Sequence, residues 1–345
     1  MLNELLGSYT FRIVLMGTVL LGLVSGIIGV ILTLRKQALI GDVLSHSTLP
    51  GVVLAYIITK ESSLYVSIIG AIVASIVSFL IISLIKKYSR LKNDAILALI
   101  LSAFFGFGQV LLSIIRDTAG QEQARLNKFI FGQAATMSKQ DIIFLSVILF
   151  IVLAVIITFW RHIKLFIFNS EYYQSLGFSK TIINIILNSI TILVVVSGIQ
   201  AVGVILLSAL IIAPAVTARL WSDKLLGNVI ISAIIGGLSG FLGTLFSVDV
   251  PTGPVIVIFV TSIFLVSVLI APKKGIIWTK ITNLIHKKQI KQFQLLIHIY
   301  EENKINDISN PLINEYKKMG YLSNNNEITL KGEEKVLKIL RGELR

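Results

Sequence analysis

The chain has no cysteine among its 345 residues. Structural disulfides are therefore excluded, and so are metal sites built from thiolates. The chain also lacks a G-x-x-x-x-G-K-[ST] sequence, the loop that binds the phosphates of ATP in many hydrolases. No arrangement of Ser, His and Asp indicates an intramembrane hydrolase. The sequence thus predicts no enzyme, and if the protein depends on ATP, a separate subunit has to hydrolyse it.

Charged residues are also scarce. They make up 14% of the chain, against 55% hydrophobic residues, and the mean hydropathy is +0.86. This composition is typical of a membrane protein. The first ten residues lack a basic segment and a small-residue cleavage site, so they predict no cleaved signal peptide. The composition changes at Ala271-Pro272, which predicts a membrane domain over residues 1–272 and a charged domain over residues 273–345.

Apolar segments dominate the first of these domains and predict an all-α polytopic membrane protein. Each is close to the roughly 20 residues that a helix needs to cross a bilayer. The sixth and seventh segments run together through residues 197–200, as a tight hairpin or as one broken segment, so eight or nine spans are predicted. The segments cover residues 11–34, 38–59, 64–85, 94–115, 141–160, 181–199, 201–220, 225–247 and 254–271.

Basic residues near the ends of these segments predict the orientation. Connections on one side hold 11 Lys and Arg residues and those on the other side hold 6, and the richer side also carries the basic tail. Basic connections favour the cytosol. With nine spans, the N-terminus is expected outside and the C-terminus in the cytosol.

Asp42 and His46 are the sharpest functional signal. They lie four residues apart within the second apolar segment, which places both on one helix face with Cβ atoms about 5–6 Å apart. Ionisable groups at membrane depth are costly and mark ion pathways. One interpretation is a structural hydrogen bond between the two side chains. The other is a divalent metal site, for which one pair has too few donor atoms.

A homodimer on a two-fold axis would double that pair. Two carboxylates and two imidazoles suit Mn²⁺, Fe²⁺ or Zn²⁺ better than Ca²⁺ or Cu⁺. Without thiolates, such a site would release its ion readily, which is typical of a carrier rather than of a permanently bound cofactor.

Two connections carry weaker signals. Between Arg161 and Lys180, Ser170 and Gly177 predict the start and end of a short amphipathic helix on the cytosolic side. It would rest on lipid headgroups or dock into a partner. On the outer side, Asp249 could attract cations to a pore mouth, or could belong to a plain turn.

Together these stretches resemble the ABC-3 family, the membrane permeases of binding-cassette importers for manganese, zinc or iron. The resemblance covers residues 10–271. The stretches that carry it, in family order, are RKQALIGDVLSHSTLPGVVLAY from Arg35, LNKFIFGQAATMSKQD from Leu126, SLGFSKTIINI from Ser175, QAVGVILLSALIIAPAVTARL from Gln200 and DVPTGP from Asp249.

The resemblance implies a permease dimer in the bacterial cytoplasmic membrane, with a central ion path and alternating access. The partners would be two ATPase subunits inside and a metal-binding lipoprotein outside, and the second permease would be the same chain or a related one. Asp42 and His46 match the family motif and are expected to bind the transported Mn²⁺, Zn²⁺ or Fe²⁺, with Mn²⁺ favoured. The helix that couples to the ATPase is expected around Glu171, Ser175, Leu176 and Gly177.

The tail resembles the winged-helix module of metal-dependent repressors, most clearly in EITLKGEEKVLKIL from Glu327. It predicts a small α+β domain. Only residues 304–310 separate its first two helices, which leaves little room for a helix-turn-helix. A regulatory or dimer-stabilising role is therefore favoured over nucleic-acid binding. The expected elements are helices over residues 284–302, 311–319 and 331–344, and a two-stranded wing over residues 321–330 that turns at residues 324–326.

Two other functions compete. An ion-coupled secondary transporter would need no ATPase, but it predicts inverted repeats and several intramembrane acids, and Asp42 is the only deeply placed acid. A permease for iron chelates or cobalamin needs a wide cavity and no pair of ion ligands, so Asp42 and His46 argue against it.

Overall fold

The computed structural model describes residues 8–61, 63–115, 137–247, 250–272, 274–302, 311–323 and 327–340. The chain forms two compact units, residues 1–267 and 268–345, and each is described by itself.

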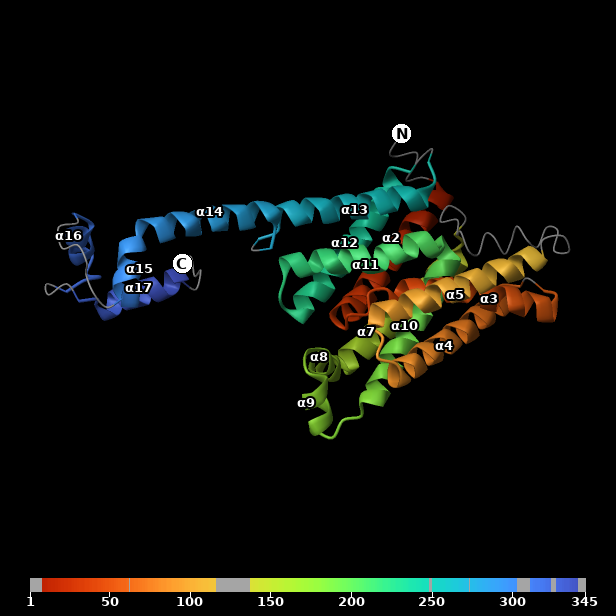
Figure 1. Cartoon of the computed structure of the whole chain (residues 1–345). Coiled ribbons are helices and arrows are strands. Elements are labelled where there is room, and N and C mark those ends of the chain that lie inside the picture. Colours follow the sequence, from red (N-terminus) through yellow and green to blue (C-terminus); the bar gives the residue numbers. More distant parts are fainter. Residues whose placement is uncertain are drawn as a thin grey trace. The chain divides into compact units, whose positions relative to one another are not determined.

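The first unit is all helical, as predicted for a polytopic membrane protein (Figure 1). Eight of the described helices are long and apolar enough to cross a membrane. They are α2 (Tyr9–Leu34), α3 (Ile40–Thr59), α4 (Leu64–Tyr88), α5 (Asn93–Ile114), α7 (Lys139–Thr158), α10 (Lys180–Val202), α12 (Leu225–Leu245) and α13 (Thr252–Ile270).

A ninth apolar helix, α11 (Val204–Trp221), is shorter and follows α10 after a single residue. That residue, Gly203, has φ 83° and ψ 173°, a backbone region that is essentially restricted to glycine. The chain folds back at Gly203, as the packing of Leu207 of α11 against Gly198 of α10 shows. The predicted sixth and seventh segments are therefore two helices, and the break lies a few residues later than predicted.

Small residues bring α2 and α12 into close antiparallel contact, which is the packing role that small residues play between membrane helices. Gly22 lies against Gly236, and Gly26 lies against Ser232. The Ser232 hydroxyl donates a hydrogen bond to the Gly26 carbonyl at 2.8 Å. These contacts hold α2 and α12 together along much of their length.

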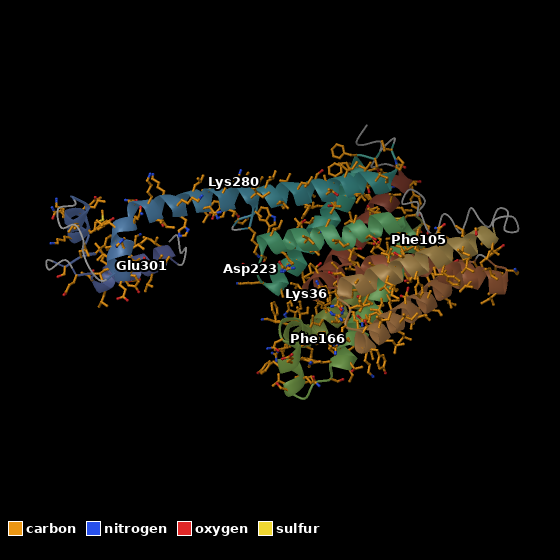
Figure 2. The ribbon with its side chains drawn as sticks, viewed as in Figure 1. Lys36, Phe105, Phe166, Asp223, Lys280 and Glu301 are labelled. Atoms are coloured by element: carbon orange, nitrogen blue, oxygen red, sulfur yellow. The ribbon has the colours of Figure 1, made fainter. Side chains whose placement is uncertain are left out.

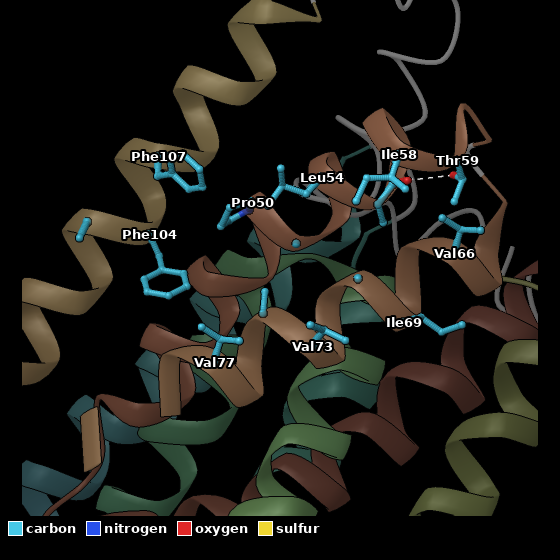
Figure 3. A pocket seen from close by; sticks show the side chains of 15 residues that line it. Pro50, Leu54, Ile58, Thr59, Val66, Ile69, Val73, Val77, Phe104 and Phe107 are labelled. Carbon is cyan, nitrogen blue, oxygen red and sulfur yellow. Dashed lines mark hydrogen bonds between the residues drawn. The ribbon is translucent and has the colours of Figure 1, made fainter. Parts of the chain in front are cut away.

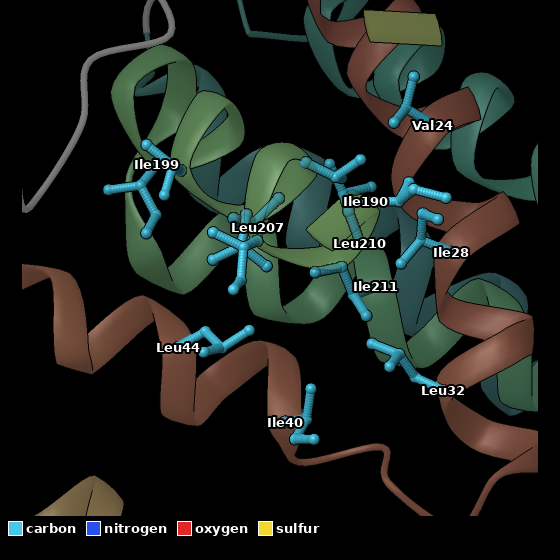
Figure 4. Close-up of a cluster of buried hydrophobic side chains, with 14 of the residues drawn as sticks. Val24, Ile28, Leu32, Ile40, Leu44, Ile190, Ile199, Leu207, Leu210 and Ile211 are labelled. Carbon is cyan, nitrogen blue, oxygen red and sulfur yellow. The ribbon is translucent and has the colours of Figure 1, made fainter. Parts of the chain in front are cut away.

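The largest hydrophobic core lies where α2, α3, α10 and α11 meet (Figure 4). Leu32 of α2, Leu44 of α3 and Leu207 of α11 have less than 2% of their surface exposed. α3 packs on its other side against α4 and α5. The N-terminal part of α3, which carries Asp42, is thereby fixed between this core and α5.

Two short helices connect α7 and α10. The first, α8 (Trp160–Phe168), was not expected from the sequence. The second, α9 (Ser170–Ser175), is the predicted short helix, but its N-cap is Asn169 rather than Ser170, since the Asn169 side chain accepts a hydrogen bond from the amide of Tyr172 at 2.8 Å. Gly177 follows α9 with φ 85°, as expected for a residue that ends a helix.

The second unit contains α14 (Ile276–Gln292), α15 (Gln294–Glu302), α16 (Pro311–Lys318) and α17 (Leu330–Leu340). The predicted first helix of the tail is thus two helices, which meet at Phe293. The hydrophobic core of the second unit is a separate cluster around Phe293, Leu296, Tyr316 and Val336. Burial raises the pKa of Tyr316, with a further contribution from the charge of Glu315.

The predicted α+β character of this unit is not supported, because no strand occurs among its described residues. Leu322 and Ile328 form only an isolated antiparallel bridge. The second arm of the predicted wing, after the turn, is too short to form a strand because α17 begins at Leu330. The hydroxyl of Thr329 already accepts a hydrogen bond from the amide of Gly332 at 3.1 Å. The turn at residues 324–326 lies outside the described residues.

Candidate metal site

The first turns of α3 hold the candidate ligands. Asp42 lies in the first turn, where the positive end of the helix dipole stabilises a carboxylate. Pro50 lies one turn after His46 within the same helix. Proline has no amide proton, so the carbonyl of His46 loses its normal helical donor. The local sequence thus gathers a carboxylate, an imidazole and a carbonyl without its helical donor within nine residues.

Asp42 and His46 lie on the same face, as predicted. Their Oδ1 and Nε2 atoms are 3.5 Å apart, and the side chains are 28% and 26% exposed, respectively. The ring of Phe105 on α5 meets the imidazole edge to face, with centroids 5.0 Å apart. Contacts with each other and with Phe105 therefore hold the two side chains in place, but both side chains remain partly exposed.

Neighbouring hydroxyl groups on α3 are directed to the backbone of their own helix. Ser45, Ser47 and Thr48 are buried, and each donates to a carbonyl of its own helix at 2.7–2.8 Å. No group of three or more His, Cys, Asp or Glu side chains with metal-binding geometry occurs in the described part of the chain. One copy of the chain therefore offers Asp42 and His46 without a third ligand of those types.

Ser208 of α11 is a site residue that the sequence analysis missed. Its hydroxyl donates a hydrogen bond to Asp42 Oδ1 at 2.8 Å, across 166 residues of sequence. The available signal was that Ser208 is the only polar residue between Val204 and Val216. This bond fixes one carboxylate oxygen and ties α11 to α3.

We expect Ser208→Ala to weaken metal binding about 10-fold, because residues that orient a ligand typically contribute 10–100-fold to metal affinity. Ser208→Thr keeps the hydroxyl and is the matched control. The measurement is the concentration dependence of metal uptake, with the amount of protein in the membrane determined for each variant. Equal concentration dependence for Ser208→Ala and the wild type would contradict an orienting role.

Arg35 holds the turn before α3 in place. Its guanidinium donates to Asn184 Oδ1 at 2.6 Å and to Asn188 Oδ1 at 3.3 Å, both on α10. It also lies over the ring of Phe166 on α8, 5.8 Å from the centroid. Burial lowers its pKa to about 10, so the group stays charged at neutral pH. Arg35 thus links the α2–α3 turn to α8 and α10.

The predicted coupling residues lie on an exposed helix that is anchored at one point. Glu171, Ser175, Leu176 and Gly177 are all exposed. Between them, Tyr173 is 4% exposed, its hydroxyl lies 3.4 Å from Nδ1 of His162 on α8, and burial raises its pKa. Exposed residues around a buried Tyr173 form a surface that is suited to contact with a partner protein.

Asp249, the expected outer mouth residue, lies outside the described residues. A different polar contact occurs at the start of α7, where the Gln200 amide donates to Asp141 Oδ1 at 3.3 Å. Asp141 also completes a capping box with Ser138. The α10–α11 hairpin is therefore attached to the start of α7.

A groove of about 710 Å³ lies among α3, α4 and α5 (Figure 3). Its lining is apolar except for Thr59, whose hydroxyl bonds to the Ala55 carbonyl at 2.8 Å. Neither Asp42 nor His46 lines it. An apolar groove of this kind offers no ligand to a metal ion.

The comparisons with known proteins agree with this fold. The model of the ABC 3 transport family matches residues 8–271. The manganese transport system membrane protein MntC of Bacillus subtilis is 39% identical over 298 residues, which are 86% of this chain and 68% of that protein. The zinc transport system membrane protein TroC of Treponema pallidum is 37% identical over 280 residues, 80% of this chain and 94% of that protein.

One solved structure, PsaBC from Streptococcus pneumoniae in complex with Fab, is similar with a TM-score of 0.69 and 28% identity. The match covers 79% of this chain and 98% of that chain.

Proposed function

Since this chain belongs to the ABC 3 transport family, we propose that it is the permease of an ATP-driven importer of divalent transition-metal ions. Members of this family are transport subunits rather than enzymes, and ATP is hydrolysed by a separate subunit. Mn²⁺ is the favoured cargo, because MntC of Bacillus subtilis, at 39% identity, is named for manganese transport. Zn²⁺ and Fe²⁺ are the other candidate cargoes.

The observation that carries the proposal is the pair of Asp42 and His46, one helical turn apart and 3.5 Å from each other. Within a bilayer, such a pair marks an ion pathway. The set is incomplete in one chain, and a second copy on a two-fold axis would add another Asp and another His. Four such ligands suit a divalent transition metal.

In this proposal the chain forms a dimer with itself or with a related permease. A lipoprotein delivers the ion outside, and two ATPases act inside. ATP-driven closure of the ATPases rocks α9, and the site is exposed alternately to the two sides. The basic connections support a cytosolic position for α9 and for residues 273–345. The latter would then be a regulatory or dimer-stabilising unit in the cytosol.

Transport itself is tested by uptake of radiolabelled Mn²⁺, in competition with Zn²⁺, in cells that express the chain together with its proposed ATPase and lipoprotein partners. We expect uptake to stop when the ATPase carries a substitution of its phosphate-binding lysine, and to persist when a protonophore removes the proton gradient. The opposite pair of results would identify a secondary transporter. Uptake of cobalamin or an iron chelate instead of free metal would support the third candidate.

The coupling role of α9 predicts a loss of transport without a loss of folding. Leu176 is 47% exposed, so Leu176→Asp should leave the fold intact while it places a charge where the ATPase would bind. We expect the ATPase to copurify at least about 10-fold less with this variant, a change of ~1.4 kcal/mol. Leu91→Asp, at 53% exposure in the connection between α4 and α5, is the matched control. Normal copurification of the ATPase with Leu176→Asp would place the contact elsewhere.

A further inference from the structure

Helix α14 carries an apolar surface that no described residue covers. Ile277, Trp278, Ile281, Leu284 and Ile285 are 51%, 51%, 44%, 67% and 46% exposed, respectively, and α14 contains no buried residue. At 100° per residue, these five side chains fall within an arc of about 120°. We call this arc the apolar face of α14.

The apolar face points away from the core of the second unit. His286 marks the opposite side of the helix, since its Nε2 atom lies 2.7 Å from the carbonyl oxygen of Ile339 on α17. On the helical wheel, His286 is about 140° from the middle of the apolar face. The contacts of α14 within the unit, with α15 and α17, therefore leave the apolar face free.

The charge on α14 is of one sign. The helix has four lysines, Lys280, Lys287, Lys288 and Lys291, and no acidic residue. Three of them, Lys280 (Figure 2), Lys287 and Lys291, follow one edge of the apolar face, and Lys288 lies in line with the face at its C-terminal end. This combination of an apolar face, a lysine edge and a tryptophan is typical of helices that lie in a lipid interface.

The chain keeps the start of α14 near the bilayer. The membrane helix α13 ends at Ile270 and α14 begins at Ile276. The five residues between them can span no more than about 20 Å when fully extended. A lipid surface is thus within reach whatever the orientation of the second unit.

A second copy of the chain fits this face less well. In a contact between two copies through this face, α14 has no acidic side chain to pair with the lysines of the other copy. Anionic lipid headgroups provide that charge, and lysine side chains can extend along the apolar surface toward them.

We infer that α14 is a membrane-surface helix that inserts its apolar face, residues 277, 278, 281, 284 and 285, into a leaflet containing anionic phospholipid. Its lysines then bind the headgroups. This attachment would hold the second unit against the bilayer. This attachment does not depend on metal transport, so it can be tested independently of the proposed function.

The absence of cysteine gives a direct test, because one cysteine can be introduced into the full-length chain and labelled alone. Leu284→Cys places an NBD fluorophore on the apolar face, and Thr279→Cys places it about 140° away on the same helix. The protein is put into nanodiscs of phosphatidylcholine, with or without 30% phosphatidylglycerol, that contain lipid spin-labelled near the headgroup. We expect strong quenching at residue 284 in the anionic discs and weak quenching at residue 279.

The lysines are tested in the same discs. Lys280→Gln with Lys287→Gln should lower the ratio of inserted to detached α14 by on the order of 10-fold, whereas Lys317→Gln with Lys318→Gln on α16 should leave it unchanged. Failure of the lipid to quench the label at residue 284 would show that the face does not lie in the leaflet, and would overturn the inference. Equal quenching in both lipid mixtures, with no effect of the α14 lysines, would overturn it as well.

Discussion

Asp42→Asn is expected to abolish metal uptake while the protein still reaches the membrane. The amide keeps the shape of the side chain and its contact with Ser208, but it removes the charge that a divalent cation needs. Substitutions of groups that merely orient a ligand cost 10–100-fold in metal affinity, so the loss of a ligand should reduce uptake at least about 100-fold. The measurement is uptake of radiolabelled Mn²⁺, corrected for the amount of protein in the membrane.

The matched control is Asp94→Asn, which makes the same change at an exposed residue in the first turn of α5. It should retain full uptake. His46→Gln should behave like Asp42→Asn, because both side chains belong to one site. If Asp42→Asn and His46→Gln both transport normally, the pair is a structural hydrogen bond and the ion path lies elsewhere.

The sequence predicted best those features that depend on a single helix or segment. Asp42 and His46 belong to a single helix, so their spacing alone predicts that they share a face. The nine apolar segments likewise correspond to nine described apolar helices, because length and hydropathy are properties of each segment. In the tail, the wing prediction was not supported, since the arm before α17 is only three residues long.

Contacts between distant segments could not be predicted in this way. Ser208 reaches Asp42 across 166 residues, and Arg35 meets Asn184 and Asn188 on α10. Both sets of hydrogen bonds depend on how whole helices pack. A single polar residue in an apolar segment does not indicate which residue it will contact. Asn169 was missed for a local reason: both Asn169 and Ser170 are good N-cap residues, and only the backbone conformation decides between them.

The close contact of α2 with α12 predicts the largest effect on stability. A Cβ atom at Gly22 would overlap the backbone carbonyl of Gly236, and a backbone atom cannot turn aside as a side chain can. Gly22→Ala should therefore force the helices apart and break the neighbouring contact between Ser232 and Gly26. Overpacking of this kind costs about 1–3 kcal/mol and occasionally more. Thermal unfolding in detergent, followed by loss of the monodisperse protein, measures the effect.

Gly106 of α5 provides the control, because a Cβ atom there meets no other atom within 4 Å. Gly106→Ala should leave the unfolding temperature unchanged or raise it, since alanine favours the helix by up to about 1 kcal/mol relative to glycine. The two variants carry the same substitution within apolar helices, so helix propensity acts equally on both. A lower unfolding temperature for Gly22→Ala alone therefore reports the distance between α2 and α12. Equal behaviour of the two would mean that the helices do not meet at Gly22 and Gly236.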